Sequence, residues 1–83
     1  MNYEVLLSLE AVDDVLRITM VGGAKSDVLK ASTQIQDALR SDPIRAGEHL
    51  SEGLYFIDRE PLRGFYTIDT DKMLVEIVNV KQV

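Results

Sequence analysis

The sequence contains no cysteine, and this absence excludes disulfides, thiolate nucleophiles and cysteine-ligated zinc together. It also has no apolar run near the roughly 20 residues that a helix needs to cross a bilayer. Residues Met1 to Glu4 do not form the basic segment that precedes the apolar segment of a signal peptide. We therefore expect a cytoplasmic protein that does not enter the membrane.

Basic residues are few as well. Nine lysines and arginines oppose 14 acidic residues, and the net charge is −5. Binding to a phosphate backbone depends on lysine and arginine, so direct binding to nucleic acid is not expected, although a local basic patch is compatible with this average. The carboxylates do not follow the spacing of a metal-binding loop. We therefore predict neither a metal nor another cofactor.

The chain has 83 residues, of which 46% are apolar, so it is long enough for one domain, placed at residues 1–83, and too short for two. Apolar residues alternate over Tyr3–Leu7, which predicts a short strand with one buried face. Ser8 is a suitable N-cap for a helix over Leu9–Val21. The apolar stripe of this helix has helical spacing and comprises Leu9, Val12, Leu16 and Met20, with Val15 beside them.

A second helix is predicted between two breaks in the pattern. Gly22-Gly23 ends the first helix, because glycine readily takes the left-handed conformation, and Ser26 is placed to cap the second. The second helix stops at Asp42-Pro43, because the residue before a proline disfavours helical geometry. The short link between the two helices predicts an antiparallel helix hairpin. The apolar stripe of the second helix comprises Val28, Ala31, Ile35, Ala38 and Leu39.

The second half of the chain predicts a three-stranded meander after a polar connection over Ile44–Gly53. Short links at Glu60-Pro61 and Thr70-Asp71 separate the strands and make neighbouring strands antiparallel. The fold class is therefore α+β, with one strand, a helix hairpin and a meander, and with the helices on one face of the sheet. The three predicted strands are Leu54–Arg59, Leu62–Asp69 and Lys72–Val80.

Two-residue turns at both links would determine which side chains share a face. Arg59 would lie opposite Leu62, and Asp69 opposite Lys72. The face covered by the helices would then hold Tyr55, Ile57, Leu62, Tyr66, Ile68, Met73, Val75 and Ile77. The opposite face would hold Leu54, Phe56, Asp58, Arg63, Phe65, Thr67, Leu74, Glu76, Val78 and Val80.

The opposite face is more apolar than a sheet face left to water. Several large apolar side chains together on an exposed face mark a binding surface, for a protein partner or for a second copy of the chain. The alternative is that strands tolerate these residues or that a tail covers them. The predicted partner-binding residues are Leu54, Phe56, Phe65, Leu74 and Val78.

Four short segments stand out within this order of elements: Asp42-Pro43, Gly47-Glu48, Glu60 to Asp69 and Val75 to Val80. Together with the order of elements, they resemble the RelE/ParE toxins. In that family a Pro-Leu-Arg segment starts a strand, and a Phe-Tyr-x-Val/Ile-Asp segment leads through a tight turn into a final apolar strand. The resemblance covers nearly the whole chain in pattern and is specific over residues 54–80. It implies the toxin of a type II toxin–antitoxin pair, neutralised by a small antitoxin that wraps it.

The resemblance implies two different activities. RelE-like members cut messenger RNA on the ribosome without a metal, using basic residues on the sheet and basic and tyrosine residues at the C-terminal end, whereas ParE-like members inhibit DNA gyrase. On this resemblance the catalytic candidates are Arg59, Arg63 and Lys81. The alternative for the arginines is local ion pairing, Arg63 with Asp58 and Arg59 with Glu60.

Two departures from the RelE-like pattern argue against cleavage of RNA. No arginine or tyrosine follows Lys81, and residues 47–52, before the meander, are not basic. We therefore expect a toxin-like component of a type II toxin–antitoxin system that acts by binding protein. The alternatives are an endoribonuclease, either ribosome-dependent or degenerate, and a non-toxic structural or regulatory homodimer. The expected partner is a cognate antitoxin or the chain itself, and gyrase and the ribosome are the candidate targets.

Overall fold

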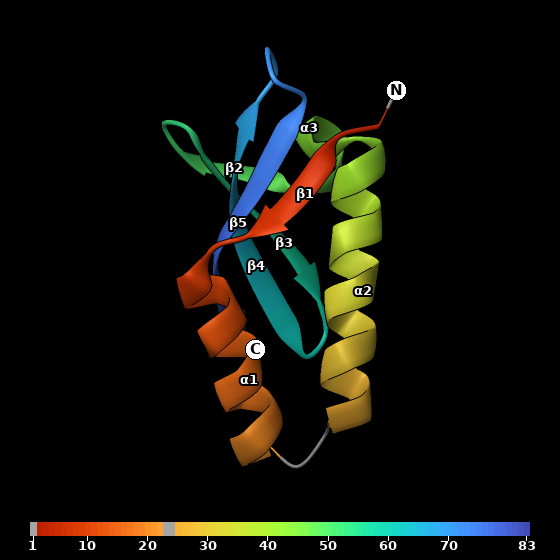
Figure 1. The fold of residues 1–83 in the computed structure, drawn as a ribbon, viewed down its shortest axis with the longest axis vertical. Helices are drawn as coiled ribbons and strands as arrows, with labels where there is room; N and C mark the ends of the chain where they lie inside the picture. The colour runs from red at the N-terminus through yellow and green to blue at the C-terminus, as the bar shows by residue number, and fades with distance from the viewer. Residues whose placement is uncertain (1, 23–24) are drawn as a thin grey trace.

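A five-stranded sheet forms the centre of the fold, and the two long helices lie on one side of it (Figure 1). The computed structural model describes residues 2–22 and 25–83. The strand order is β1-β5-β4-β3-β2; β1 is parallel to β5, and the other neighbours are antiparallel. This confirms the predicted α+β class. The elements are β1 Glu4–Leu7, α1 Leu9–Gly22, α2 Lys25–Ser41, α3 Pro43–Ala46, β2 Glu48–Ser51, β3 Leu54–Arg59, β4 Leu62–Asp69 and β5 Leu74–Gln82.

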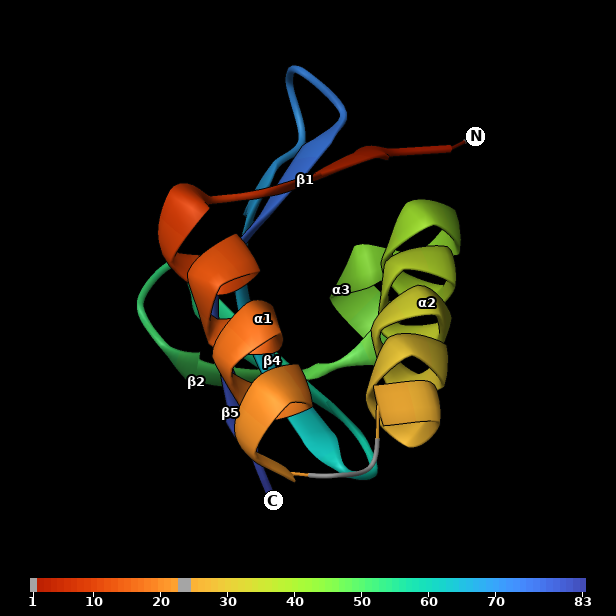
Figure 2. The same ribbon diagram turned by 60° about the horizontal axis from the view of Figure 1, so that its bottom comes forward.

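The predicted helix hairpin is present, and Figure 2 shows α1 in front of β4 and β5 with α2 beside it. Ser8 caps α1 as predicted, since its Oγ accepts a hydrogen bond from the Ala11 amide at 3.0 Å. Ser26 was predicted to cap α2 but lies within its first turn, because that helix already begins at Lys25. Gly23, part of the predicted break between the helices, lies outside the described residues.

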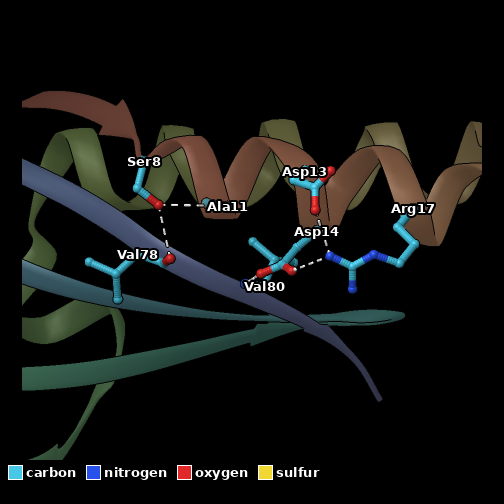
Figure 3. A network of polar contacts seen from close by, with 7 residues as sticks. All are labelled: Ser8, Ala11, Asp13, Asp14, Arg17, Val78 and Val80. Atoms are coloured by element: carbon cyan, nitrogen blue, oxygen red, sulfur yellow. Dashed lines mark hydrogen bonds and ion pairs between the residues drawn. The ribbon is translucent and has the colours of Figure 1, made fainter.

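The two helices differ in how well their apolar stripes predicted the core. In α2 the buried residues Val28, Ala31, Ile35 and Leu39 all belong to the predicted stripe. In α1 the predicted residues Leu9, Val12, Leu16 and Met20 face solvent. Val15, predicted beside them, is partly buried against the core, and the fully buried residue is Ala11. The reason is that α1 approaches β5 closely at the small or polar residues Ser8, Ala11 and Asp14, which Figure 3 shows. Val15 and Ile18 of α1 also pack against the core, so the remaining side of the helix faces solvent.

The polar connection predicted over Ile44–Gly53 is wrong, because it contains α3 and β2. Asp42 caps α3 by accepting a hydrogen bond from the Arg45 amide at 3.3 Å, and Pro43 occupies the start of that helix, where a missing N–H costs nothing. All four residues of β2 are exposed. An edge strand of this kind has no apolar alternation, so the sequence pattern could not indicate it.

The β3–β4 hairpin has the predicted register, with Tyr55 opposite Tyr66 and Arg59 opposite Leu62. The β4–β5 register is displaced by two residues from the prediction, since Asp69 pairs with Leu74 rather than with Lys72. Four residues, Thr70 to Met73, form this turn instead of two. An even displacement leaves Leu74 to Ile77 on their predicted faces, so Val75 and Ile77 are buried as expected.

A bulge in β5 causes the remaining error. Phe65 pairs with Asn79 and Tyr66 with Ile77, so Val78 is an extra residue in β5. The extra residue reverses the alternation after it. Val80, which was predicted on the opposite face, is therefore turned toward the helices and is only 7% exposed.

Candidate partner-binding face

The two aromatic pairs of the β3–β4 hairpin lie on opposite faces of the sheet. Tyr55 and Tyr66 stack with ring centroids 5.6 Å apart on the side of the helices, where Tyr66 is fully buried. Phe56 pairs with Phe65 on the other side, where both are half-buried. We call this second side the outer face and define it by Leu54, Phe56, Arg63, Phe65, Val78 and Lys81.

The outer face is hollowed between β2, β3 and β5. The hollow has a volume of about 210 Å³, and three of the five predicted partner-binding residues line it, namely Leu54, Phe65 and Val78. Leu50 of β2 also lines it and is 51% exposed. The sequence pattern does not single out Leu50, because the exposed strand β2 has no alternation of apolar and polar residues. The remaining lining residues are Asn79 and Lys81.

The other two predicted partner-binding residues lie outside this hollow. Leu74 lines a separate hollow of about 260 Å³ with Leu6 and Thr67, at the β1 end of the sheet. Phe56 is covered by the guanidinium of Arg63, whose central carbon is 4.6 Å from the ring centroid. The structure therefore gathers three of the five residues in one place.

Arg63 is held by a cross-strand carboxylate as well as by the ring beneath it. Its Nε and Nη2 donate to the two carboxylate oxygens of Asp58 at 2.6 and 2.9 Å, the two-pronged geometry that is specific to arginine. These hydrogen bonds lower the pKa of Asp58 and raise the pKa of Arg63. The predicted ion pair of Arg63 with Asp58 is thus present, and the guanidinium is already occupied.

The three catalytic candidates do not converge. Arg63 and Lys81 are opposite each other on β4 and β5, and the Lys81 Nζ lies 5.8 Å from the centroid of Phe65. Arg59 pairs with Leu62, whose side chain is buried beneath the helices, so Arg59 belongs to the other face. Its Nη1 donates to the Asp58 carbonyl at 2.7 Å rather than to Glu60, and no ion pair joins Arg59 to Glu60 in the described chain.

A buried contact behind the outer face holds α3 and β2 against the meander. The Tyr66 Oη donates to the Pro43 carbonyl at 2.7 Å, and Gly47 lies so close that a Cβ there would overlap this hydroxyl and the Phe56 carbonyl. Burial raises the pKa of Tyr66 to about 12. The contact accounts for a glycine before β2, and β2 carries Leu50 to the hollow.

The described residues contain no group of three or more carboxylate or histidine side chains that could hold a metal ion. None of the described helices is long and apolar enough to cross a membrane. The residues that define the outer face are apolar side chains, one lysine and one ion-paired arginine.

Comparison with known proteins supports the fold. No protein-family model and no curated protein sequence matches the chain. Solved structures do match, and they show a RelE/ParE-like toxin fold. The toxin–antitoxin complex RelBE2 from Mycobacterium tuberculosis gives a TM-score of 0.85 at 21% identity, over 100% of this chain and 93% of that one.

Two further structures extend the likeness to both branches of this fold. The archaeal RelE–RelB complex from Pyrococcus horikoshii OT3 gives a TM-score of 0.73 at 16% identity, over 99% of this chain and 96% of that one. The chromosomal ParDE toxin–antitoxin system from Pseudomonas aeruginosa gives a TM-score of 0.71 at 15% identity, over 98% of this chain and 96% of that one. The fold is thus shared by RelE-named and ParE-named structures, and it does not select between their activities.

Proposed function

We propose that this chain is the toxin-like component of a type II toxin–antitoxin pair and that it acts by binding protein through the outer face. Solved structures similar to it in fold include toxin–antitoxin complexes. The observation that carries the proposal is the hollow of about 210 Å³ lined by Leu50, Leu54, Phe65 and Val78, because apolar side chains gathered in an open recess are typical of an anchor site for a partner.

The arrangement of basic residues favours binding over cleavage of RNA. Cleavage by Arg59, Arg63 and Lys81 would require their side chains to meet at one phosphate, but Arg59 lies on the opposite face from the other two. Arg63 is also neutralised by Asp58. Under this proposal, gyrase and the ribosome are both candidate targets. The proposal also places the protein in the cytoplasm.

Growth tests separate the toxin hypothesis from that of a non-toxic homodimer. Expression of the 83-residue chain in a bacterial host should arrest growth. Co-expression of the protein encoded beside its gene, which this proposal expects to be the antitoxin, should restore growth. A harmless chain would contradict the toxin-like role. Arrest that disappears in Arg59→Ala, while binding to the neighbouring protein is retained, would favour the ribonuclease instead.

A matched pair of variants tests the outer face. Phe56→Asp with Phe65→Asp places two charges on it and should abolish the complex with the neighbouring protein on a sizing column, because the charges would be desolvated on binding. The control, Thr33→Asp with Gln34→Asp, adds the same two charges to the exposed side of α2. Retention of the complex by the Phe56/Phe65 variant would contradict the proposal.

A milder variant guards against misfolding. Leu50 is already 51% exposed, so Leu50→Asp should leave the circular dichroism spectrum of the free chain unchanged. It should still weaken the complex by about tenfold, which corresponds to the loss of one apolar anchor of about 1.4 kcal/mol.

A further inference from the structure

The solvent side of α1 carries an apolar row that the proposed function does not use. Leu9 is 90% exposed, Val12 41%, Leu16 56% and Met20 82%. They recur at intervals of three, four and four residues along one side of the helix, and we call them the α1 row. Single exposed apolar residues need no explanation, whereas a contiguous set of large ones marks an interaction surface.

We propose that the α1 row packs antiparallel against the α1 row of a second copy of this chain, giving a twofold-symmetric dimer. Intervals of three and four residues are those of the seam between paired helices. A twofold interface needs a surface that is complementary to itself. In the antiparallel arrangement Leu9 lies beside the partner's Met20, and Val12 lies beside the partner's Leu16, so every member of the row is covered.

The charges beside the row select the antiparallel arrangement. Asp13 and Arg17 lie on the same flank of the row, one helical turn apart, and their side chains are 72% and 62% exposed. In antiparallel helices this flank of one copy faces the same flank of the other, so Arg17 meets the partner's Asp13, and Asp13 meets the partner's Arg17. In parallel helices this flank of one copy would face the opposite flank of its partner. The opposite flank of α1 holds Thr19 and no charged residue of α1.

The existing geometry allows this exchange. The Arg17 Nη2 is 2.8 Å from the Asp13 carboxylate and 3.1 Å from that of Asp14, which is mostly buried against β5 (Figure 3). Arg17 can therefore turn toward the partner's Asp13 while Asp14 stays on the Val80 amide at 2.9 Å. The dimer requires no rearrangement of the sheet.

The size of the seam indicates a weak dimer. A helix of 14 residues is about 21 Å long, and two such helices cover less than the roughly 800 Å² per partner of a stable complex. We expect a dissociation constant on the order of 10–100 μM. The outer face lies on the other side of the sheet, so the dimer leaves it free, and this inference stands or falls separately from the proposed function.

Sedimentation equilibrium of the 83-residue chain tests the dimer. The average mass should rise from 9.3 kDa toward twice that value with increasing concentration. Leu16→Glu should hold the mass at the monomer value at every concentration. The control, Ile44→Glu, changes an apolar residue of α3 that is similarly exposed at 53%, and it should dimerise like the wild type.

A charge exchange tests the orientation. Asp13→Arg alone and Arg17→Asp alone place like charges across the seam, so each should weaken the dimer. An equimolar mixture of the two variants restores opposite charges across the seam only in the mixed, antiparallel dimer. The mixture should associate about tenfold more tightly than either variant alone.

Four results would overturn the inference. They are a wild-type chain that stays at 9.3 kDa over the whole concentration range, a Leu16→Glu variant that dimerises, a mixture no tighter than its components, and a dimer lost in Phe65→Asp instead. If Leu16→Glu loses its helical spectrum, Met20→Glu replaces it, since that position is 82% exposed. If the wild-type chain is monomeric and the α1 variants no longer bind the neighbouring protein, the α1 row would be the binding site of an antitoxin helix. That result would also refute self-association.

Discussion

Replacing Tyr66 with phenylalanine removes one buried hydroxyl and leaves the ring in place. Tyr66 is 0% exposed, and its Oη donates to the Pro43 carbonyl at 2.7 Å. The substitution leaves that carbonyl without its donor, and an unsatisfied buried group costs about 1–3 kcal/mol. For a loss of about 2 kcal/mol in a domain of this size, we expect the melting temperature to fall by roughly 8–16 °C at pH 7.

The same substitution should change how stability depends on alkaline pH. Burial, with a smaller contribution from Tyr55, raises the pKa of Tyr66 from 10.0 to about 12. The folded chain therefore holds this proton more tightly than the unfolded chain does. The stabilisation is fully present below pH 10 and is lost as the pH rises through 12. A hundredfold difference in proton affinity corresponds to about 3 kcal/mol, and Tyr66→Phe has no such group to titrate.

Urea unfolding followed by circular dichroism at several pH values between 7 and 11.5 measures both effects. The wild type should lose more stability than Tyr66→Phe above pH 10, so the difference between them should shrink as the pH rises. Tyr3→Phe serves as the control, because that tyrosine is only partly buried. The reasoning fails if Tyr66→Phe matches the wild type at pH 7, or if the two decline in parallel above pH 10.

Two further substitutions test contacts that position the elements around the sheet. Gly47→Ala should lower the free energy of unfolding, measured by thermal unfolding, by about 3 kcal/mol. The reason is that the added Cβ overlaps the Tyr66 hydroxyl and the backbone carbonyl of Phe56, which cannot move aside. A Gly47→Ala variant as stable as the wild type would contradict this packing. Asp14→Ala removes the acceptor of the Val80 amide at 2.9 Å and should cost about 1–3 kcal/mol in urea unfolding. Asp14→Asn keeps an oxygen that can accept this bond, so it should be the more stable of the two, and an equal loss would assign the effect to charge.

The β3–β4 hairpin shows where the sequence was sufficient. A two-residue link at Glu60-Pro61 joins two alternating runs, and only one register keeps both faces consistent, so Tyr55 was placed opposite Tyr66. The same alternation already put Arg59 on the face of Leu62, away from Arg63. The divergence of the two arginines could therefore have been predicted from the sequence.

The next turn shows where local signals failed. Asp69 Oδ1 accepts a hydrogen bond from the Lys72 amide at 3.1 Å, and Met73 has a φ of 53°, a left-handed conformation that a methionine gives no reason to expect. No glycine or proline marks this longer turn. The predicted face survived only because the register moved by an even number of residues, and the bulge at Val78 then displaced Val80.

The orientation of α1 about its own axis could not be predicted from the sequence of α1, because the strand it packs against, β5, determines it. β1 ends at Leu7, opposite Ile77, so the last part of β5 has no neighbouring strand on that edge. Buried backbone groups need partners, and α1 supplies them: Ser8 Oγ donates to the Val78 carbonyl at 2.9 Å, and Asp14 accepts from the Val80 amide.

The need of the β5 backbone for hydrogen-bond partners bears on both surfaces on which the proposals rest. Ser8, Ala11 and Asp14 are small or polar, and this lets the start of α1 reach the β5 backbone. Val15 and Ile18 pack against the core, and the α1 row lies on the remaining side of the helix, where it is turned to solvent. The same contact closes the edge of β5 to an added strand. A partner that extends the sheet is thereby excluded from this part of the edge, whereas the outer face and the α1 row stay open to partners. If a bound antitoxin were found paired as a strand with residues 78–82 of β5, it would have to displace Ser8 and Asp14, and this account of α1 would be wrong.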